Sequence, residues 1–401
     1  MTSYSATRDS EQLRYLQADI ANFVLRYQSR PANPNRRTIF LFPGGMGSQL
    51  LRARTPYQPG GPQNQTFQYD TVWLTPFTFL GDALDLKMHN VGGVYHDLND
   101  QIIIPYGSVQ LFGLTPYTRF TLWCDFNDLD WFIFGWDWRR RLEDTVDFFL
   151  NIFLPAFGQA CPKALQKFVL IGHSFGGMVV SLMLKDPNPA LNCMTHAITV
   201  ASPFYGYDGQ IHRWFEGEPL LNQLGKMDVI KTISSFPGCY VLPYLDDQTF
   251  QANQATLGIS YPSDDPTNSQ IVDPFNPGSH RYPQNTDFNM AELGNGLNTY
   301  RNIAAGPTAQ YLGQFSNIRG IQSQNTTTGS IFWSLLTGPN NPNNSPIVDG
   351  PSIKGDGTQP AFSTRLATLS ANQIHDVTGS TVDHMFLMEQ DVTHQAIAQI
   401  L

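Results

Sequence analysis

A fully apolar segment, a serine flanked by glycines and a helix follow one another between residues 168 and 185. Residues 168–171 (FVLI) have no polar side chain, which is typical of a strand buried on both faces of a parallel sheet. Residues 175–185 have the length of a helix and end at Asp-Pro-Asn-Pro, where proline stops helices. A second apolar run, residues 197–200 (AITV), follows. This order predicts a strand–helix–strand unit and therefore an α/β fold with mostly parallel strands.

The turn between this strand and this helix carries Gly-His-Ser-Phe-Gly, with Ser174 at its centre. The pentapeptide alone is weak evidence, because Gly and Ser are common residues. Its position is informative, since a strained turn between a strand and a helix lifts the serine hydroxyl out of the sheet. The N-terminus of the helix then points at developing negative charge. We therefore interpret Ser174 as the nucleophile of a serine hydrolase.

A serine nucleophile needs a base and an orienting carboxylate, which follow it along the chain in the order Asp or Glu, then His. Asp356 lies between two glycines in KGDGT, which suits a loop at the end of a strand. His384 precedes a segment with helical spacing, residues 391–401. His375 is the alternative base, whereas His394 is expected to face solvent or to cap the last helix. The residues alone leave His384 and His375 open.

Acyl transfer also needs two amide donors for the oxyanion. Residues 38–42 (TIFLF) predict another buried strand, and Pro-Gly-Gly-Met-Gly-Ser follows it. We expect Phe175 to supply one amide and Gly45 or Met46 to supply the other. This glycine-rich loop lacks the GKS or GKT ending of a phosphate loop.

Composition narrows the classes of partner. The net charge of −9, without clusters of Lys and Arg, argues against nucleic acid. Charged residues make up only 14% of the chain, which favours an apolar or ester-bearing substrate over an ionic one. The four cysteines are widely spread and no HExxH motif occurs, so we expect no metal and no cofactor.

The chain is predicted to form a single domain over residues 1–401 with two insertions. A leader helix is expected at residues 10–27, capped by Ser10. The lid-like insertion covers approximately residues 54–120 and the cap residues 203–305, where the strand–helix alternation is lost; residues 325–350 are expected to form a long polar loop. The aromatic stretch 72–80 and residues 212–221 are candidates for an acyl pocket or a lid.

Targeting signals are not evident in the sequence. Its first residues lack the apolar core of a secretory signal, and no run reaches the length of a membrane span. The localisation is expected to be cytoplasmic by default, or secreted if a leader has been removed.

Several of these segments together resemble the lecithin-cholesterol acyltransferase family, with its bacterial lipase-like and phospholipase-like members. They are FLFPGGMGSQL, Trp136-Asp137-Trp138-Arg139, GHSFGG, ASPFYG, GDGT and the tail VDHMFLMEQDV. The resemblance implies the α/β-hydrolase fold, a mostly parallel central sheet flanked by helices with an inserted cap or lid. It also selects His384 over His375 as the base. No cysteine pair brackets residues 48–82, so the disulfide-closed lid of animal members is not expected.

The expected function is that of a serine esterase or lipase, which hydrolyses apolar or lipid-like carboxylic esters through an acyl-enzyme on Ser174. The alternatives are an O-acyltransferase or phospholipase A, and a catalytically silent binding protein of the same fold. The expected partners are a small-molecule ester or lipid and a transient lipid-surface contact through the cap, with no obligate protein partner. Asp137 and Arg139 are expected to form a buried ion pair.

Overall fold

The computed structural model describes most of the chain, and all structural statements below concern those residues. They are residues 3–33, 35–58, 67–73, 83–110, 115–218, 221–243, 248–249, 252–253, 269–271, 287–328, 331–334, 347–349 and 352–401. Residues 74–80 of the aromatic stretch and residues 219–220 of the second candidate pocket segment lie outside the described residues, as do parts of the two predicted insertions and of the predicted polar loop.

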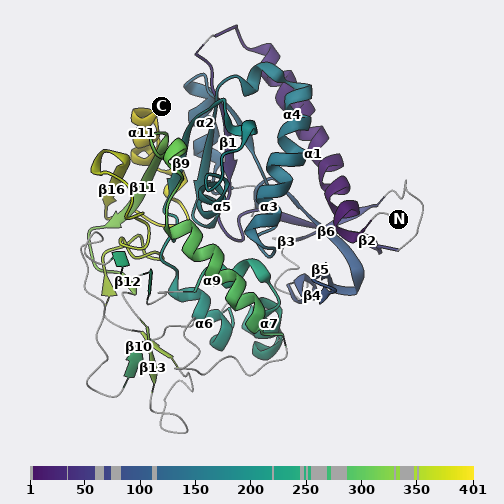
Figure 1. The fold of residues 1–401 in the computed structure, drawn as a ribbon, viewed down its shortest axis with the longest axis vertical. Coiled ribbons are helices and arrows are strands. Elements are labelled where there is room, and N and C mark those ends of the chain that lie inside the picture. Colours follow the sequence, from purple (N-terminus) through teal and green to yellow (C-terminus); the bar gives the residue numbers. More distant parts are fainter. Residues whose placement is uncertain are drawn as a thin grey trace.

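A six-stranded, all-parallel sheet forms the centre of the molecule (Figure 1). Its spatial order is β16-β11-β9-β8-β1-β7. The bounds are β1 Thr38–Phe42, β7 Asp130–Ile133, β8 Phe168–His173, β9 Met194–Val200, β11 Phe315–Gln322 and β16 Ile374–Gly379. Both β1 and β8 are buried along their whole length, which is why their sequences are unbroken apolar runs. The predicted α/β fold with a parallel sheet is confirmed.

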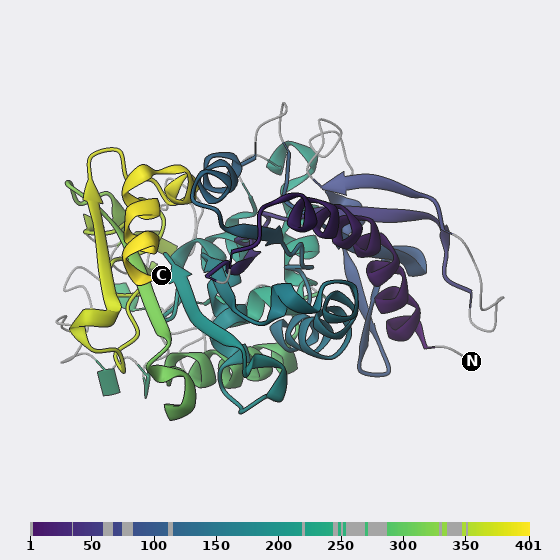
Figure 2. The ribbon, with the colours of Figure 1, turned by 90° about the horizontal axis from the view of Figure 1, so that it is seen from above.

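Helices cover both faces of this sheet. Successive residues of a strand point to opposite faces, so an entirely apolar strand gives both faces apolar side chains that helices must bury. From β1, Phe40 and Phe42 pack in the core cluster that contains α1, α3, α4, α5 and α9, whereas Ile39 and Leu41 pack with α2 and α11. Figure 2 shows α1 and α11 on opposite sides of the molecule. The bounds are α1 Tyr4–Ser29, α2 Thr118–Phe126, α3 Leu142–Phe148, α4 Leu154–Ala160, α5 Phe175–Met183, α9 Met290–Ala304 and α11 Asp391–Ile400.

The leader helix begins earlier than the sequence suggested. Its N-cap is Ser3, whose hydroxyl accepts a hydrogen bond from the amide of Ala6 over 3.2 Å. The predicted cap at Ser10 is wrong, because Ser10 lies inside the helix and Ser3 caps its N-terminus.

Smaller elements outside the central sheet fall within two stretches of the chain. Between β1 and α2 lie an antiparallel sheet of order β3-β2-β6 and the hairpin β4–β5. After β9 come α6, α7 and three short strands, β10, β13 and β14, at one end of the molecule (Figure 1). The bounds are β2 Gln49–Pro56, β3 Tyr69–Trp73, β4 Met88–Val91, β5 Val94–Asp97, β6 Gln101–Tyr106, α6 Asp208–Glu216, α7 Lys226–Ser234, β10 Ser269–Ile271, α10 Ala309–Leu312, β12 Thr327–Thr328, β13 Ile331–Ser334, β14 Ile347–Asp349 and β15 Ser352–Ile353.

The described part of residues 325–350 contains short strands, so the expectation of an irregular loop is wrong there: β13 pairs with both β10 and β14. The boundaries of the two insertions stay a prediction. No helix in the described ranges combines the length and the apolarity needed to cross a membrane.

A buried ionic network joins the N-terminal helix to the loop after β7. Arg139 donates to both oxygens of Asp137 and, over 2.8 Å, to Asp97. Arg140 donates to the same two carboxylates over 3.1 and 2.9 Å, and the hydroxyl of Tyr4 donates to Asp97 over 2.6 Å. The expected buried pair of Asp137 and Arg139 is therefore present, as part of a larger network.

Candidate active site

Ser174 lies in a strained turn between β8 and α5. Its φ is 53° and its ψ −123°, a conformation that costs a non-glycine residue energy and is concentrated at functional sites. The turn is so tight that a Cβ on Gly172 would lie 2.4 Å from the Cα of Gly177, and one on Gly176 would lie 2.3 Å from the carbonyl oxygen of Phe42. These two glycines therefore permit the turn.

A hydrogen-bonded chain connects Ser174, His384 and Asp356. The Nε2 of His384 lies 2.8 Å from the Oγ of Ser174, and its Nδ1 lies 2.7 Å from Oδ2 of Asp356. A carboxylate can only accept, so we assign the proton of the neutral ring to Nδ1. That tautomer leaves the lone pair of Nε2 free to accept the serine proton.

Backbone groups fix the carboxylate and the loop that carries the histidine. Oδ1 of Asp356 accepts from the amides of Thr358 and Gln359 over 3.0 and 2.6 Å, and the carbonyl oxygen of Asp356 accepts from the amide of His384 over 3.1 Å. Asp356 is completely buried, and only 12% of the His384 side chain is exposed.

These residues come from the carboxyl ends of three strands, the edge at which open α/β sheets bind ligands. Ser174 follows β8 and His384 follows β16. Asp356 comes later along the chain than the end of β11, but the loop returns there: the amide of Gln322 donates to the carbonyl oxygen of Gly355 over 2.7 Å. A Cβ on Gly320 would lie 2.9 Å from that of Asp356, so the bare backbone of β11 makes room for the carboxylate.

The other candidate histidines lie elsewhere. His375 is the second residue of β16 and is paired with Ile318 of β11, at the amino end of the strand. His394 is buried, donates from Nε2 to the carbonyl oxygen of Met388 over 2.8 Å and stacks on Trp123. The expectation that His394 faces solvent or caps the last helix is wrong, because α2 packs over it.

The glycine-rich loop after β1 lies directly against the turn that carries Ser174. A Cβ on Gly44 would lie 3.2 Å from the Cβ of Ser174, and one on Gly45 would lie 3.3 Å from the ring of Phe175. The loop forms a turn closed by a 2.9 Å bond from the amide of Gly47 to the carbonyl oxygen of Gly44. Met46, inside this turn, has a φ of 64°.

The backbone amides named as oxyanion donors have no partner among the described residues. Phe175 is the first residue of α5, so its amide has no carbonyl partner within the helix. The amides of Gly45 and Met46 donate to no described group. Phe175 directly follows Ser174, and Gly45 lies against the side chain of Phe175.

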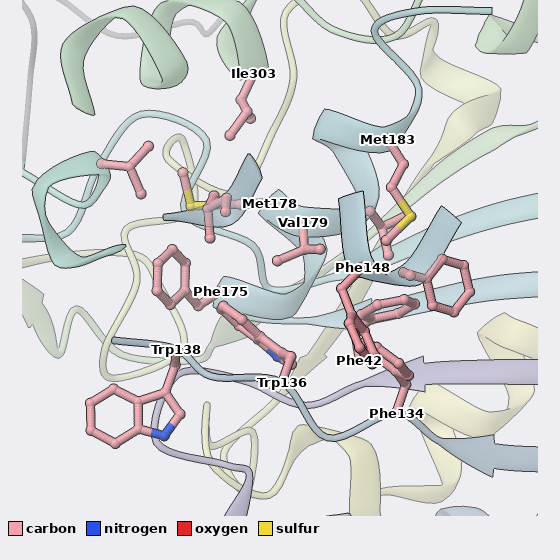
Figure 3. Close-up of a cluster of buried hydrophobic side chains, with 14 of the residues drawn as sticks. Phe42, Phe134, Trp136, Trp138, Phe148, Phe175, Met178, Val179, Met183 and Ile303 are labelled. Carbon is pink, nitrogen blue, oxygen red and sulfur yellow. The ribbon is translucent and has the colours of Figure 1, made fainter. Parts of the chain in front are cut away.

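Two tryptophans hold the glycine-rich loop in place. The indole of Trp73 donates to the carbonyl oxygen of Met46 over 2.8 Å, and that of Trp136 donates to the carbonyl oxygen of Pro43 over 2.8 Å. Figure 3 shows Trp136 against the ring of Phe175, and their ring centroids are 5.1 Å apart. The loop is thus fixed from the side of β3 and from the side of the Trp136 loop.

A second hydrogen-bonded chain, which the sequence did not indicate, joins the glycine-rich loop to the histidine loop. The amide of Gly44 donates to the hydroxyl of Tyr117 over 2.9 Å, and that hydroxyl lies 3.1 Å from Nδ1 of His173. Nε2 of His173 lies 3.0 Å from the carbonyl oxygen of His384. A carbonyl only accepts, so Nε2 carries the proton and Nδ1 accepts from Tyr117.

His173 is neutral in this arrangement. Burial, aided by the nearby His384, lowers the pKa of His173 to about 3. A neutral ring with one donor and one acceptor is what the second chain requires. His173 directly precedes Ser174 in the sequence, but Tyr117 has no local signal that could have indicated its place here.

The sheet order, the turn carrying Ser174 and the positions of Asp356 and His384 define the α/β-hydrolase fold. No protein-family model matches the sequence, and no curated protein matches it. Among solved structures, a chain from the crystal structure of the Tle4–Tli4 complex is similar at 14% identity, with a TM-score of 0.49. The match covers 92% of this chain and 99% of that chain. The resemblance to the acyltransferase family stays a prediction.

Proposed function

We propose that this chain is a carboxylic ester hydrolase that acts through an acyl-enzyme on Ser174. The observation that carries the proposal is the continuous chain from the Ser174 hydroxyl through both nitrogens of His384 to Asp356, with bonds of 2.8 and 2.7 Å. These are the distances over which a base can take a proton from its nucleophile.

In the proposed first step, Oγ of Ser174 attacks the ester carbonyl while Nε2 of His384 takes its proton. Asp356 stabilises the imidazolium and keeps the ring in the correct tautomer. The negative charge on the former carbonyl oxygen is stabilised by the amide of Phe175 and by that of Gly45 or Met46. When the tetrahedral intermediate collapses, the alcohol leaves with the proton from His384.

In the second step, water attacks the acyl-enzyme, with His384 as the base, and the acid is released. Transfer of the acyl group to an alcohol is the alternative. A silent binding protein would not need a serine and an aspartate hydrogen-bonded to the two nitrogens of one histidine.

The surroundings of His384 support an apolar substrate. Met385 and Phe386, the next two residues, are 62% and 52% exposed. Large apolar side chains at such exposure are in contact with water that an acyl chain or a lipid surface would displace. We therefore propose that the ester is apolar or lipid-like.

The test replaces Ser174 by alanine and measures hydrolysis of a short-chain nitrophenyl ester. We expect Ser174→Ala to lose activity to background while the melting temperature is retained. Ser181→Ala is the matched control, because Ser181 lies on α5 and its buried hydroxyl has no hydrogen-bond partner in the described structure. Equal activity of the two variants would refute the proposal.

A further inference from the structure

One histidine and two aspartates meet at the start of α6, on elements far apart in sequence. Asp208 is the first residue of α6, His212 lies one turn later, and Asp349 ends β14. One ligand atom from each of the three lies within 4.8 Å of the others. None of them belongs to the hydrogen-bonded chain of Ser174. Figure 1 shows α6 next to the small sheet that contains β13, which pairs with β14.

The histidine of this cluster is hydrogen-bonded on both sides by carboxylates. Nδ1 of His212 lies 2.8 Å from Oε2 of Glu216, and Nε2 lies 2.9 Å from Oδ1 of Asp349. Carboxylates only accept, so without a bound ion both nitrogens must carry protons. The single positive charge of that imidazolium then faces the negative charges of both Asp208 and Asp349.

Asp208 is the most buried of the three candidate ligands. Its side chain is 9% exposed, and no described side chain donates a hydrogen bond to its carboxylate, which contacts backbone amides of the first turn of α6. One imidazolium cannot balance both Asp208 and Asp349, whereas a divalent cation between them would.

We propose that Asp208, His212 and Asp349 bind a divalent transition-metal ion, Zn²⁺ in particular, which ties α6 to β14. The ion replaces the proton on Nε2 of His212, so one proton is released for each ion bound. Glu216 then accepts from Nδ1–H of the liganding imidazole, the arrangement that commonly orients a zinc-bound histidine.

The donor set favours zinc over calcium. Calcium takes six to eight oxygen ligands, whereas one imidazole nitrogen and two carboxylate oxygens suit Zn²⁺ with a water in the remaining position. Ligand atoms on a tetrahedral ion with bonds of about 2 Å are about 3.3 Å apart. Nε2 of His212 and Oδ1 of Asp349, now 2.9 Å apart, would have to separate slightly to admit the ion, which rotation of the exposed Asp349 side chain allows.

A second group of possible ligands, His89, His96 and Asp100, provides the matched control. It lies on and beside the β4–β5 hairpin, and His89 and Asp100 have side chains that are 45% and 49% exposed. The carboxylate of this group, Asp100, is exposed rather than buried. A His96→Gln variant therefore removes a histidine from a similar cluster without touching α6.

The experiment measures zinc binding by the full chain after treatment with EDTA and dialysis, using equilibrium dialysis with metal analysis and thermal unfolding. We expect the wild type and His96→Gln to bind Zn²⁺ equally tightly and to gain several degrees in melting temperature, since an ion that binds only the folded state stabilises it. Asp208→Asn and His212→Gln should bind at least tenfold more weakly and gain nothing. Ca²⁺ at the same concentration should leave the melting temperature unchanged.

Stability without metal separates loss of the site from loss of the fold. In EDTA, Asp208→Asn should melt no lower than the wild type, because it removes one of three carboxylates that share the single positive charge of His212. Zinc affinity that is unchanged in Asp208→Asn and His212→Gln, or that falls in His96→Gln instead, would overturn the proposal. A melting shift with Ca²⁺ but not with Zn²⁺ would overturn the choice of ion.

Discussion

Nε2 of His173 donates a hydrogen bond to the backbone carbonyl oxygen of His384 over 3.0 Å. The residue immediately before Ser174 thus holds the backbone of the residue proposed as its base. Through Tyr117, the same imidazole is connected to the amide of Gly44 in the glycine-rich loop. One buried chain of hydrogen bonds therefore sets the relative positions of the turn at Ser174, the loop that carries His384 and the glycine-rich loop.

Tyr117→Phe tests this positioning. The change leaves the amide of Gly44 and Nδ1 of His173 without a partner, and each unsatisfied buried group costs about 1–3 kcal/mol. We expect kcat to fall about tenfold with little change in KM, together with a lower melting temperature.

Tyr311→Phe is the matched control, because the hydroxyl of Tyr311 on α10 is also buried and accepts from the amide of Asn188 over 3.0 Å, outside both hydrogen-bonded chains of the site. It should lower the melting temperature without lowering kcat. If both variants lose kcat in proportion to stability, the Tyr117 chain has no special role in positioning.

The choice of base is tested by His384→Ala against His375→Ala. Loss of a general base costs about 10²–10⁴-fold in rate, and we expect a loss at the upper end for His384, with near wild-type activity for His375→Ala. His375 is partly buried at the amino end of β16, away from Ser174. Ester hydrolysis assays in parallel check the ranking, and the reverse order would move the base to His375.

The buried network around Asp97 predicts a pH-dependent stability. Burial raises the pKa of Asp97, but Arg140 and Arg139 outweigh it and hold the pKa below its ordinary value. The stabilisation is therefore present above the pKa of the unfolded chain, about 3.9, and is lost as the pH falls through the lower folded-state value.

At pH 7, Asp97→Asn should lower the free energy of unfolding by about 3–5 kcal/mol, because it leaves buried arginines without their partner. The gap to the wild type should narrow as the solution is acidified below pH 4. Urea titrations over this pH range measure the difference in the free energy of unfolding. Asp70→Asn is the control, because Asp70 forms an exposed ion pair with Arg54, and its free energy of unfolding should differ little from that of the wild type. A gap that widens in acid would contradict the account.

The sequence predicted those parts of the fold in which local pattern and burial agree. Strands β1, β8 and β9 carry apolar runs because both of their faces are covered. β16 was not predicted, because it lies at the edge of the sheet and its sequence, Ile-His-Asp-Val-Thr-Gly, mixes exposed polar and buried apolar positions. Its sequence pattern does not indicate a strand, because it is the pairing with β11 that places this segment in the sheet.

The candidate site likewise contains residues that a local motif indicates and residues that only long-range contacts place. Ser174, Asp356 and His384 stand in short motifs with glycines or loops around them, and the fold brings them together, while their catalytic roles stay a prediction. Tyr117 and the cluster at Asp208 could not be predicted, because they depend on contacts between elements 56 and 137 residues apart along the chain. No local pattern encodes such a contact.

The most direct test of the central claim maps the covalent adduct of a fluorophosphonate, which reacts with activated serines. We predict a single adduct, found by peptide mass spectrometry on Ser174, with labelling greatly slowed in His384→Ala and unchanged in Ser181→Ala. An adduct on another residue, or undiminished ester hydrolysis by a fully labelled protein, would contradict the assignment of Ser174 as the nucleophile.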